Sequence, residues 1–247
     1  MRIIVSPAKK MKTDVDTLPF QGLPQFVEQS KTLLQYLREL DYETVKGIWK
    51  CNETIAKLNR KRIENMDLHK NLTPAILSYE GIQYQYMAPN VFAQEELDYL
   101  EEHLRILSGF YGMLKPFDGV VPYRLEMQAR LGGIDLDSLY TFWDEKLANQ
   151  LFSESNCIIN LASKEYSKCI TSYLNKNVRF ITCVFGEVIH NKVVEKGTKV
   201  KMARGEMVRF MAEKQIVNPE QLKEFNRLQY TYSEQFSNES NFVYIVN

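Results

Sequence analysis

The sequence has no excess of charge of either sign, which limits the partners that it can attract as a whole. Lysine and arginine together number 31, as do aspartate and glutamate, so the formal net charge is zero. A chain without net charge has no overall field that would attract a polyanion. Contact with nucleic acid must therefore come from local basic patches, and three segments provide them: 2–12, 50–62 and 192–214.

Paired cysteines and clustered histidines are also lacking. The four cysteines show no CxxC spacing and the three histidines are scattered along the chain. Structural zinc sites and disulfide frameworks both need close or regular spacing of such residues. We therefore expect reduced, mostly buried thiols, no metal site and no cofactor.

Long apolar runs are absent as well. The apolar stretch before Ser6-Pro7 is only four residues long, which is far shorter than the apolar core of a signal peptide. No apolar run approaches the length that spans a bilayer. We expect a cytoplasmic protein that makes no contact with a membrane. Apolar residues make up 45% of the chain, with no repeats and no linker, so residues 1–247 are expected to form a single domain.

What is present is a mixture of strand and helix patterns. Apolar, β-branched runs predict strands at 2–5, 157–161, 178–185 and 242–246, and a strand pair 187–194 and 198–202 turned at Lys196-Gly197. Helical spacing predicts helices from Pro24 to about residue 40 and at 94–107, 138–152 and 204–214. Because strands lie at both ends, the termini should share one sheet. The fold class is therefore mixed α/β (α+β).

Residues 43–65 predict two short helices that meet at Lys50-Cys51-Asn52. Asparagine is a favoured N-cap, and Glu53 in the first turn complements the helix dipole. A second helix beginning at Asn52 is thus well indicated.

Several long segments resemble the YaaA family. They are VSPAKK at 5–10, LRILSGFYGMLKPFDGVVPYRLEM at 104–127, LYTFW at 139–143, NLASKEY at 160–166 and KMARGEMVRFM at 201–211. The resemblance implies a peroxide stress response protein (response to hydroperoxide) that limits iron-dependent damage and binds DNA. It also implies a barrel-like mixed sheet surrounded by helices, with a helix-hairpin-helix element.

The hairpin at about 44–65 is the best place for that element. The amides at the start of a helix attract phosphate, so such an element binds double-stranded DNA nonspecifically through its backbone. The glycine-containing turn usual in such hairpins is replaced here by Lys50-Cys51-Asn52. The expected DNA-binding residues are Lys50, Asn52, Lys57, Arg60, Lys61 and Arg62.

An enzyme is the alternative. Polar residues of the resembling segments suit a basic cleft that holds a small anionic ligand, such as a phosphorylated or nucleotide-like substrate, and that moves protons. They are Lys9, Tyr123, Arg124, Glu126, Ser163, Glu165, Lys201 and Arg204. Two other interpretations stay open: a buried ion-pair network of Arg124-Glu126 and Lys201-Arg204, and a nucleic-acid cleft in which Tyr123 stacks on a base.

Overall fold

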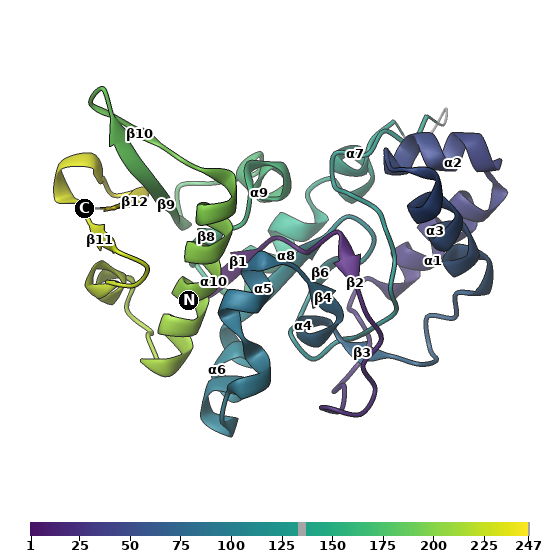
Figure 1. Cartoon of the computed structure of the whole chain (residues 1–247), viewed down its shortest axis with the longest axis horizontal. Coiled ribbons are helices and arrows are strands. Elements are labelled where there is room, and N and C mark those ends of the chain that lie inside the picture. The colour runs from purple at the N-terminus through teal and green to yellow at the C-terminus, as the bar shows by residue number, and fades with distance from the viewer. Residues whose placement is uncertain (133–136, 247) are drawn as a thin grey trace.

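A mixed sheet forms the centre of the protein (Figure 1). The computed structural model describes residues 1–132 and 137–246. Five parallel strands make the middle of the sheet: β12 (Asn241–Val246), β9 (Arg179–Ile189), β8 (Cys157–Leu161), β1 (Arg2–Val5) and β5 (Leu104–Ser108). Antiparallel strands β11 (Tyr230–Tyr232), β10 (Lys192–Val194) and β6 (Gly112–Leu114) complete it. The two terminal strands thus share one sheet, as predicted.

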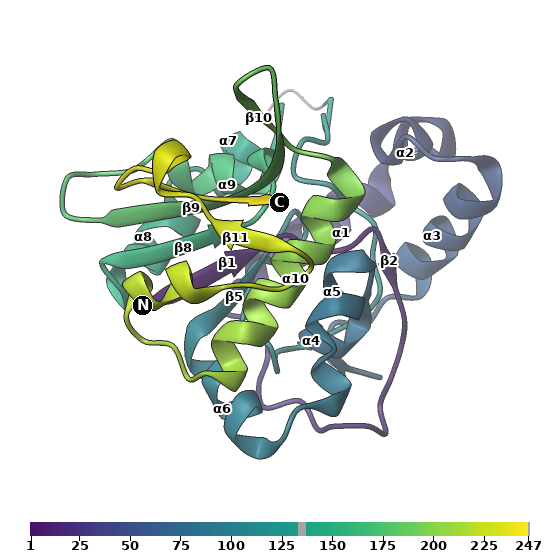
Figure 2. The same ribbon diagram turned by 60° about the vertical axis from the view of Figure 1, so that its left-hand side comes forward.

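Helices cover the sheet. Figure 2 shows α10 (Gly197–Glu213), α5 (Ile82–Met87) and α6 (Gln94–His103) in front of it. Behind it, α8 (Lys146–Glu154) and α9 (Lys164–Thr171) pack against each other, next to α7 (Leu139–Trp143). A mixed sheet surrounded by helices was expected, but within the described residues the sheet is open, with β11 and β6 at its edges, and not a closed barrel.

Three further helices stand at the side of the molecule beyond β6 (Figure 1). They are α1 (Val27–Glu39), α2 (Tyr42–Trp49) and α3 (Glu53–Asn65). The predicted pair of helices joined at Lys50–Asn52 is therefore confirmed. Short elements link this side to the sheet: β2 (Lys10–Met11), β3 (Thr73–Pro74), α4 (Ala75–Ser78), β4 (Tyr79–Glu80) and β7 (Gly119–Val120). A 3₁₀ turn at Pro89–Val91 lies between α5 and α6. Two more 3₁₀ turns, Pro219–Glu224 and Glu234–Phe236, precede and follow β11.

One apolar core connects most of these elements. Buried side chains from Ile3 to Tyr244 belong to one connected cluster. Trp143 is fully buried in it, and its indole donates to the carbonyl of Gly109. The structure therefore agrees with the expectation of a single domain.

One predicted helix is confirmed only over its first ten residues, and one predicted strand is a helix. The helix predicted at 94–107 ends at His103, and Leu104–Ser108 form β5, all of whose residues are buried beside β1. The strand predicted at 198–202 is the start of α10, and β9 instead turns back at His190-Asn191, which both have positive φ. Two consecutive residues at positive φ are what a tight hairpin turn requires.

Two further predicted helices are present, one with a later start and one divided in two. The first begins at Val27, three residues after Pro24. The helix predicted at 138–152 is two helices, α7 and α8, separated at Asp144, which has a φ of 47°. A non-glycine residue at positive φ breaks a helix, so the chain changes direction there.

Candidate active site

A cavity of about 400 Å³ opens where the parallel strands β1 and β8 end. Its walls come from the loop after β1, the turn between β4 and α5, residues 123–126, the start of α9 and the middle of α10. In the sheet, β1 has β5 as its neighbour on one side and β8 on the other, so the strand order reverses at β1. Open parallel sheets bind ligands at the carboxyl ends of strands, at the point where the strand order reverses. We call this cavity the cleft.

All eight residues predicted for a cleft line this one cavity. They are Lys9, Tyr123, Arg124, Glu126, Ser163, Glu165, Lys201 and Arg204. The folded chain thus brings together polar groups from four segments that are far apart in the sequence.

Serine hydroxyls join the two strand ends at the floor of the cleft. Ser6, directly after β1, accepts a hydrogen bond at Oγ from the amide of Ser163 at 2.8 Å and donates to Ser163 Oγ at 3.2 Å. Ser163 is the N-cap of α9, yet its side chain caps no amide of that helix. Its hydroxyl therefore faces Ser6, and the loops after β1 and β8 are held in register. The hydroxyl of Tyr84 donates to the carbonyl of Ser6, which holds α5 against the loop after β1.

Glu126 is held between two cations. Its carboxylate oxygens lie 2.7 Å from Lys9 Nζ and 3.1 Å from Arg124 Nη2. Arg124 also donates from Nε to the carbonyl of Trp49 at 3.4 Å, which ties the end of α2 to the rim of the cleft. The Arg124–Glu126 part of the ion-pair network is therefore present, whereas Lys201 and Arg204, both cations, form no pair with each other.

Glu165 is a second acidic residue of the cleft, and the charges of Glu126 and Lys9 both act on its carboxyl group. Burial raises the pKa of the Glu165 carboxyl group, and the charge of Glu126 raises it further. The hydrogen bond from the amide of Gln128 lowers this pKa but does not outweigh burial. Glu165 Oε1 accepts from the Gln128 amide at 3.2 Å. A half-buried carboxyl group with a raised pKa holds its proton more readily than a solvated one, which suits it to give and take protons in a cavity.

Tyr123 has no free ring face for a base. It is buried, its ring stacks on Phe110 at a centroid distance of 5.1 Å, and Tyr79 and Tyr111 pack edge-on to it. Its hydroxyl bridges Tyr79 Oη and Ser108 Oγ, and burial raises its pKa to about 12. The expected stacking role does not fit this environment, because the ring is part of the core.

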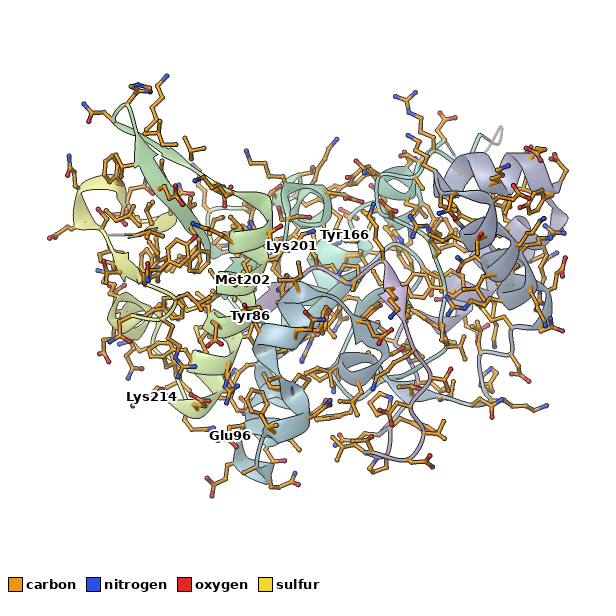
Figure 3. The ribbon with its side chains drawn as sticks, viewed as in Figure 1. Tyr86, Glu96, Tyr166, Lys201, Met202 and Lys214 are labelled. Atoms are coloured by element: carbon orange, nitrogen blue, oxygen red, sulfur yellow. The ribbon has the colours of Figure 1, made fainter. Side chains whose placement is uncertain are left out.

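Arg204 and Lys201 extend from α10 toward the cleft; Figure 3 shows Lys201 near Tyr166, another residue of the cleft wall. Arg204 is mostly buried, and this burial lowers its pKa. Its Nη2 lies 3.7 Å from Glu195, while its buried Nε has no hydrogen-bond partner among the described residues. Lys201 is exposed.

Several other wall residues are indicated by no pattern in the sequence. Glu80 ends β4, Gln83 and Tyr84 lie in α5, and Tyr166 lies in α9. Gln83 is 7% exposed, and its side-chain nitrogen has no partner within the described part of the chain. A glutamine on a short helix normally indicates a solvated surface, so only the structure could identify it. Ser6 and Lys10 lie in the VSPAKK segment, which could have drawn attention to them.

The hairpin has the predicted capping at its second helix. Asn52 accepts from the amide of Ile55 at 3.0 Å, and Lys50 ends α2 in the left-handed conformation. Glu53 lies in the first turn of α3, where it pairs with Lys46 at 2.6 Å and Lys57 at 3.4 Å. Hydrogen bonds from Lys46, first, and from Tyr42 lower the pKa of Glu53 to about 2. The start of α3 therefore already carries a carboxylate of its own.

The six residues predicted to bind DNA differ in accessibility. Lys50, Asn52, Lys57 and Lys61 are exposed. Arg60 instead pairs with Glu64 and donates to the carbonyl of Leu40. Arg62, partly buried, donates to the carbonyl of Met11. These two arginines hold α3 to neighbouring segments of the protein.

Other features of the described residues bear on ligands only indirectly. Residues 1–132 and 137–246 contain no group of histidine, cysteine or acidic side chains arranged to hold a metal ion. Cys169 and Cys183 are buried, and Cys51 and Cys157 are half-buried. Nowhere in the described part of the chain is a helix both long and apolar enough to cross a membrane.

Comparisons with known proteins agree with this picture. The chain matches the family described as peroxide stress protein YaaA over residues 1–236. It is 56% identical over 245 residues to a UPF0246 protein of Lachnoclostridium phytofermentans, covering 99% of this chain and 96% of that protein. UPF0246 proteins of Desulfitobacterium hafniense and Agathobacter rectalis are 54% and 52% identical, and 99% of this chain and 98% of each of those proteins are covered. The chain therefore belongs to the YaaA family of peroxide stress proteins.

Proposed function

We propose that the cleft is the active site of an enzyme that binds a phosphorylated or nucleotide-like substrate. The observation that carries this proposal is the gathering of eight polar residues, from four distant segments, in one cavity at the carboxyl ends of β1 and β8. This is the position at which open parallel sheets hold ligands. A network that only stabilised turns would not need to surround a cavity.

The charge of the cleft favours an anion. Its walls carry five cationic side chains, Lys9, Lys10, Arg124, Lys201 and Arg204, against three carboxylates. One of these carboxylates, Glu126, is already paired with Lys9 and Arg124. Lysine as a point charge and arginine as a planar fork are the usual phosphate ligands.

Glu165 is the proposed proton carrier. It is half-buried beside Glu126, and its pKa is raised by that burial. Perturbed carboxyl groups in a cavity with a specific charge partner occur preferentially at catalytic sites. Glu126, fixed by its two cations, orients Lys9 and Arg124 toward the ligand.

The proposal is tested by titrating the protein with a nucleoside monophosphate and with the matching nucleoside in a calorimeter. We expect the phosphate ester to bind more tightly, and Lys201→Ala to weaken that binding roughly 5- to 30-fold, as the loss of a charge-assisted contact of about 1–2 kcal/mol requires. Lys214→Ala is the matched control, since Lys214 lies just beyond the other end of α10 (Figure 3). Equal binding of ester and nucleoside would refute an anion site.

A second candidate function is nonspecific binding of double-stranded DNA through the hairpin, which would shield DNA from iron-dependent damage during peroxide stress. The observation in its favour is the capped start of α3 with Lys50, Lys57 and Lys61 exposed around it. Arg124 links the end of α2 to the cleft, so a duplex on the hairpin would lie close to the cleft rim.

Glu53 offers a sharp test of this candidate. Its carboxylate lies at the helix start that a DNA phosphate would approach. Glu53→Gln should therefore tighten duplex binding in a mobility-shift titration, and Lys57→Glu with Lys61→Glu should weaken it. Glu28→Gln is the control, because Glu28 lies in the first turn of α1 and also pairs with a lysine, Lys31. If Glu53→Gln has no effect, DNA does not bind at this helix start.

A further inference from the structure

Gln83 is a buried residue whose side-chain nitrogen has no hydrogen-bond partner among the described residues. It is 7% exposed, and it lines the cleft. Buried donors are nearly always hydrogen-bonded, because an unmade bond leaves the full desolvation cost uncompensated. A buried amide that faces a cavity is therefore expected to bond to whatever fills that cavity.

Arg204 presents a second unused donor in the same cavity. Its Nε is buried and unpaired within the described residues, and the nearest carboxylate contact of the side chain is Glu195, 3.7 Å from Nη2. A guanidinium group can only donate. The group that completes its hydrogen bonding must be an acceptor, and an anionic acceptor would also compensate its burial.

Gly205 explains why these two donors lie together. A Cβ atom at Gly205 would lie 2.2 Å from the carbonyl oxygen of Gln83, so α10 contacts α5 at a distance that only glycine permits. Arg204, the preceding residue of α10, is thereby brought to the same end of the cleft as Gln83. Figure 3 shows this helix contact from outside, where Tyr86 of α5 lies beside Met202 of α10.

The charges at this end differ from those at the other end. Lys201, one helical turn before Arg204 on α10, is exposed and forms no ion pair in the described part of the chain. Lys9 and Arg124, which come from other walls of the cleft, are instead paired with Glu126. The unused positive charge and the unused donors of the cleft therefore coincide at the contact between α5 and α10.

We infer that Gln83, Arg204 and Lys201 form an oxyanion subsite that binds the phosphoryl group of the substrate. This inference rests on the proposed function of the cleft and deepens it by giving the substrate a direction. The phosphoryl oxygens accept from the Gln83 amide, from Arg204 Nε and from Lys201. The remainder of the substrate then extends toward Glu126 and Glu165, where protons can be transferred.

The test uses the full chain and two variants of α5. Gln83→Leu keeps most of the side-chain volume and removes the donor, while Gln85→Leu changes an exposed glutamine two residues further on. Nuclear magnetic resonance follows the side-chain N–H signals of Gln83 and Arg204 during titration with inorganic phosphate and, separately, with acetate. Calorimetry measures the affinity for a nucleoside monophosphate.

We expect phosphate to shift both signals, and we expect Gln83→Leu to weaken the nucleoside monophosphate roughly 10- to 100-fold, as the loss of one hydrogen bond to a charged group predicts. Gln83→Leu should also resist urea better than the parent when no ligand is present, because a buried unpaired amide is removed. A structural role for Gln83 would instead lower the stability of this variant. Gln85→Leu should change neither property.

The outcomes separate this inference from the proposed function. If Arg124→Ala abolishes nucleotide binding but Gln83→Leu does not affect it, the cleft binds the substrate and the phosphoryl subsite lies elsewhere, which overturns the inference alone. Shifts with acetate and none with phosphate would replace the phosphoryl group by a carboxylate and also overturn it. If no phosphate compound binds the parent protein, both the proposed function and the inference are wrong.

Discussion

Replacing Gly205 with alanine should disrupt the contact between α5 and α10, and the size of the effect follows from the geometry. The added Cβ atom would lie 2.2 Å from the carbonyl oxygen of Gln83 and 2.9 Å from the amide nitrogen of Met87. Both neighbours are backbone atoms of α5, so they cannot move aside by a change of rotamer. The two helices must separate or tilt to accommodate one methyl group.

Two opposing terms set the magnitude. Overpacking of a buried contact costs about 1–3 kcal/mol, and a clash with backbone belongs at the upper end of that range. Alanine in a helix interior regains about 1 kcal/mol relative to glycine. The net expectation is a loss of about 2 kcal/mol, which lowers the midpoint of thermal unfolding by about 4–8 °C in a chain of this size.

Gly47 in α2 provides a matched control. A Cβ atom there would meet nothing within 4 Å, so Gly47→Ala should stabilise the protein by about 0.5–1 kcal/mol. Thermal and urea unfolding followed by circular dichroism would compare the two variants with the parent. If Gly205→Ala is as stable as Gly47→Ala, the helices do not pack as closely as described, and the position of Gln83 beside Arg204 loses its explanation.

Three further predictions concern charge. Glu154→Gln leaves Arg105, whose side chain is 4% exposed, without its counterion. It should lower the free energy of unfolding, measured in urea, by about 3–5 kcal/mol. Glu220→Gln removes the counterion of a half-exposed side chain and should lower it by less than about 1 kcal/mol. Burial raises the pKa of Asp118 from 3.8 to about 7, so the folded state binds more protons than the unfolded state in that range. Stability should therefore fall as the pH rises from about 4 to about 7, and Asp118→Asn should flatten the dependence and stabilise the protein at pH 7; a steeper slope in the variant would contradict this. If the hairpin contacts two to four DNA phosphates, duplex binding should weaken roughly 10- to 150-fold between 50 and 200 mM salt in a mobility-shift titration, and a flat response would exclude such contacts.

Much of the fold follows from local patterns. Strand β1, the cap at Asn52 and the terminal strand β12 are predicted because β-branched runs and capping residues act over a few positions. The errors arise where a pattern suits two structures. Leu104 and Leu107 continue the helical spacing of Leu97 and Leu100, yet they also fit a fully buried strand, and pairing with β1 decides in favour of the strand.

The reverse error occurs at the start of α10. Val200 and Met202 alternate with polar neighbours as in a strand, but Val200, Ala203 and Met207 are the buried positions and follow helical spacing. Over five residues the two periods cannot be distinguished, so the longer pattern through Met211 is needed. The hairpin turn at His190-Asn191 carries no glycine, which removed the usual signal for where β9 turns back.

The candidate site was predictable only where its residues lie in segments that resemble the family. Gln83 is outside them, and no feature of its neighbours in the sequence predicts that it is buried. Its burial depends on a glycine more than a hundred residues later, because Gly205 lets α10 approach the backbone of α5. The shape of the cleft therefore depends on how closely α5 and α10 pack. A substitution that pushes these helices apart should lower stability and ligand affinity together, whereas one that removes only the Gln83 amide should separate them.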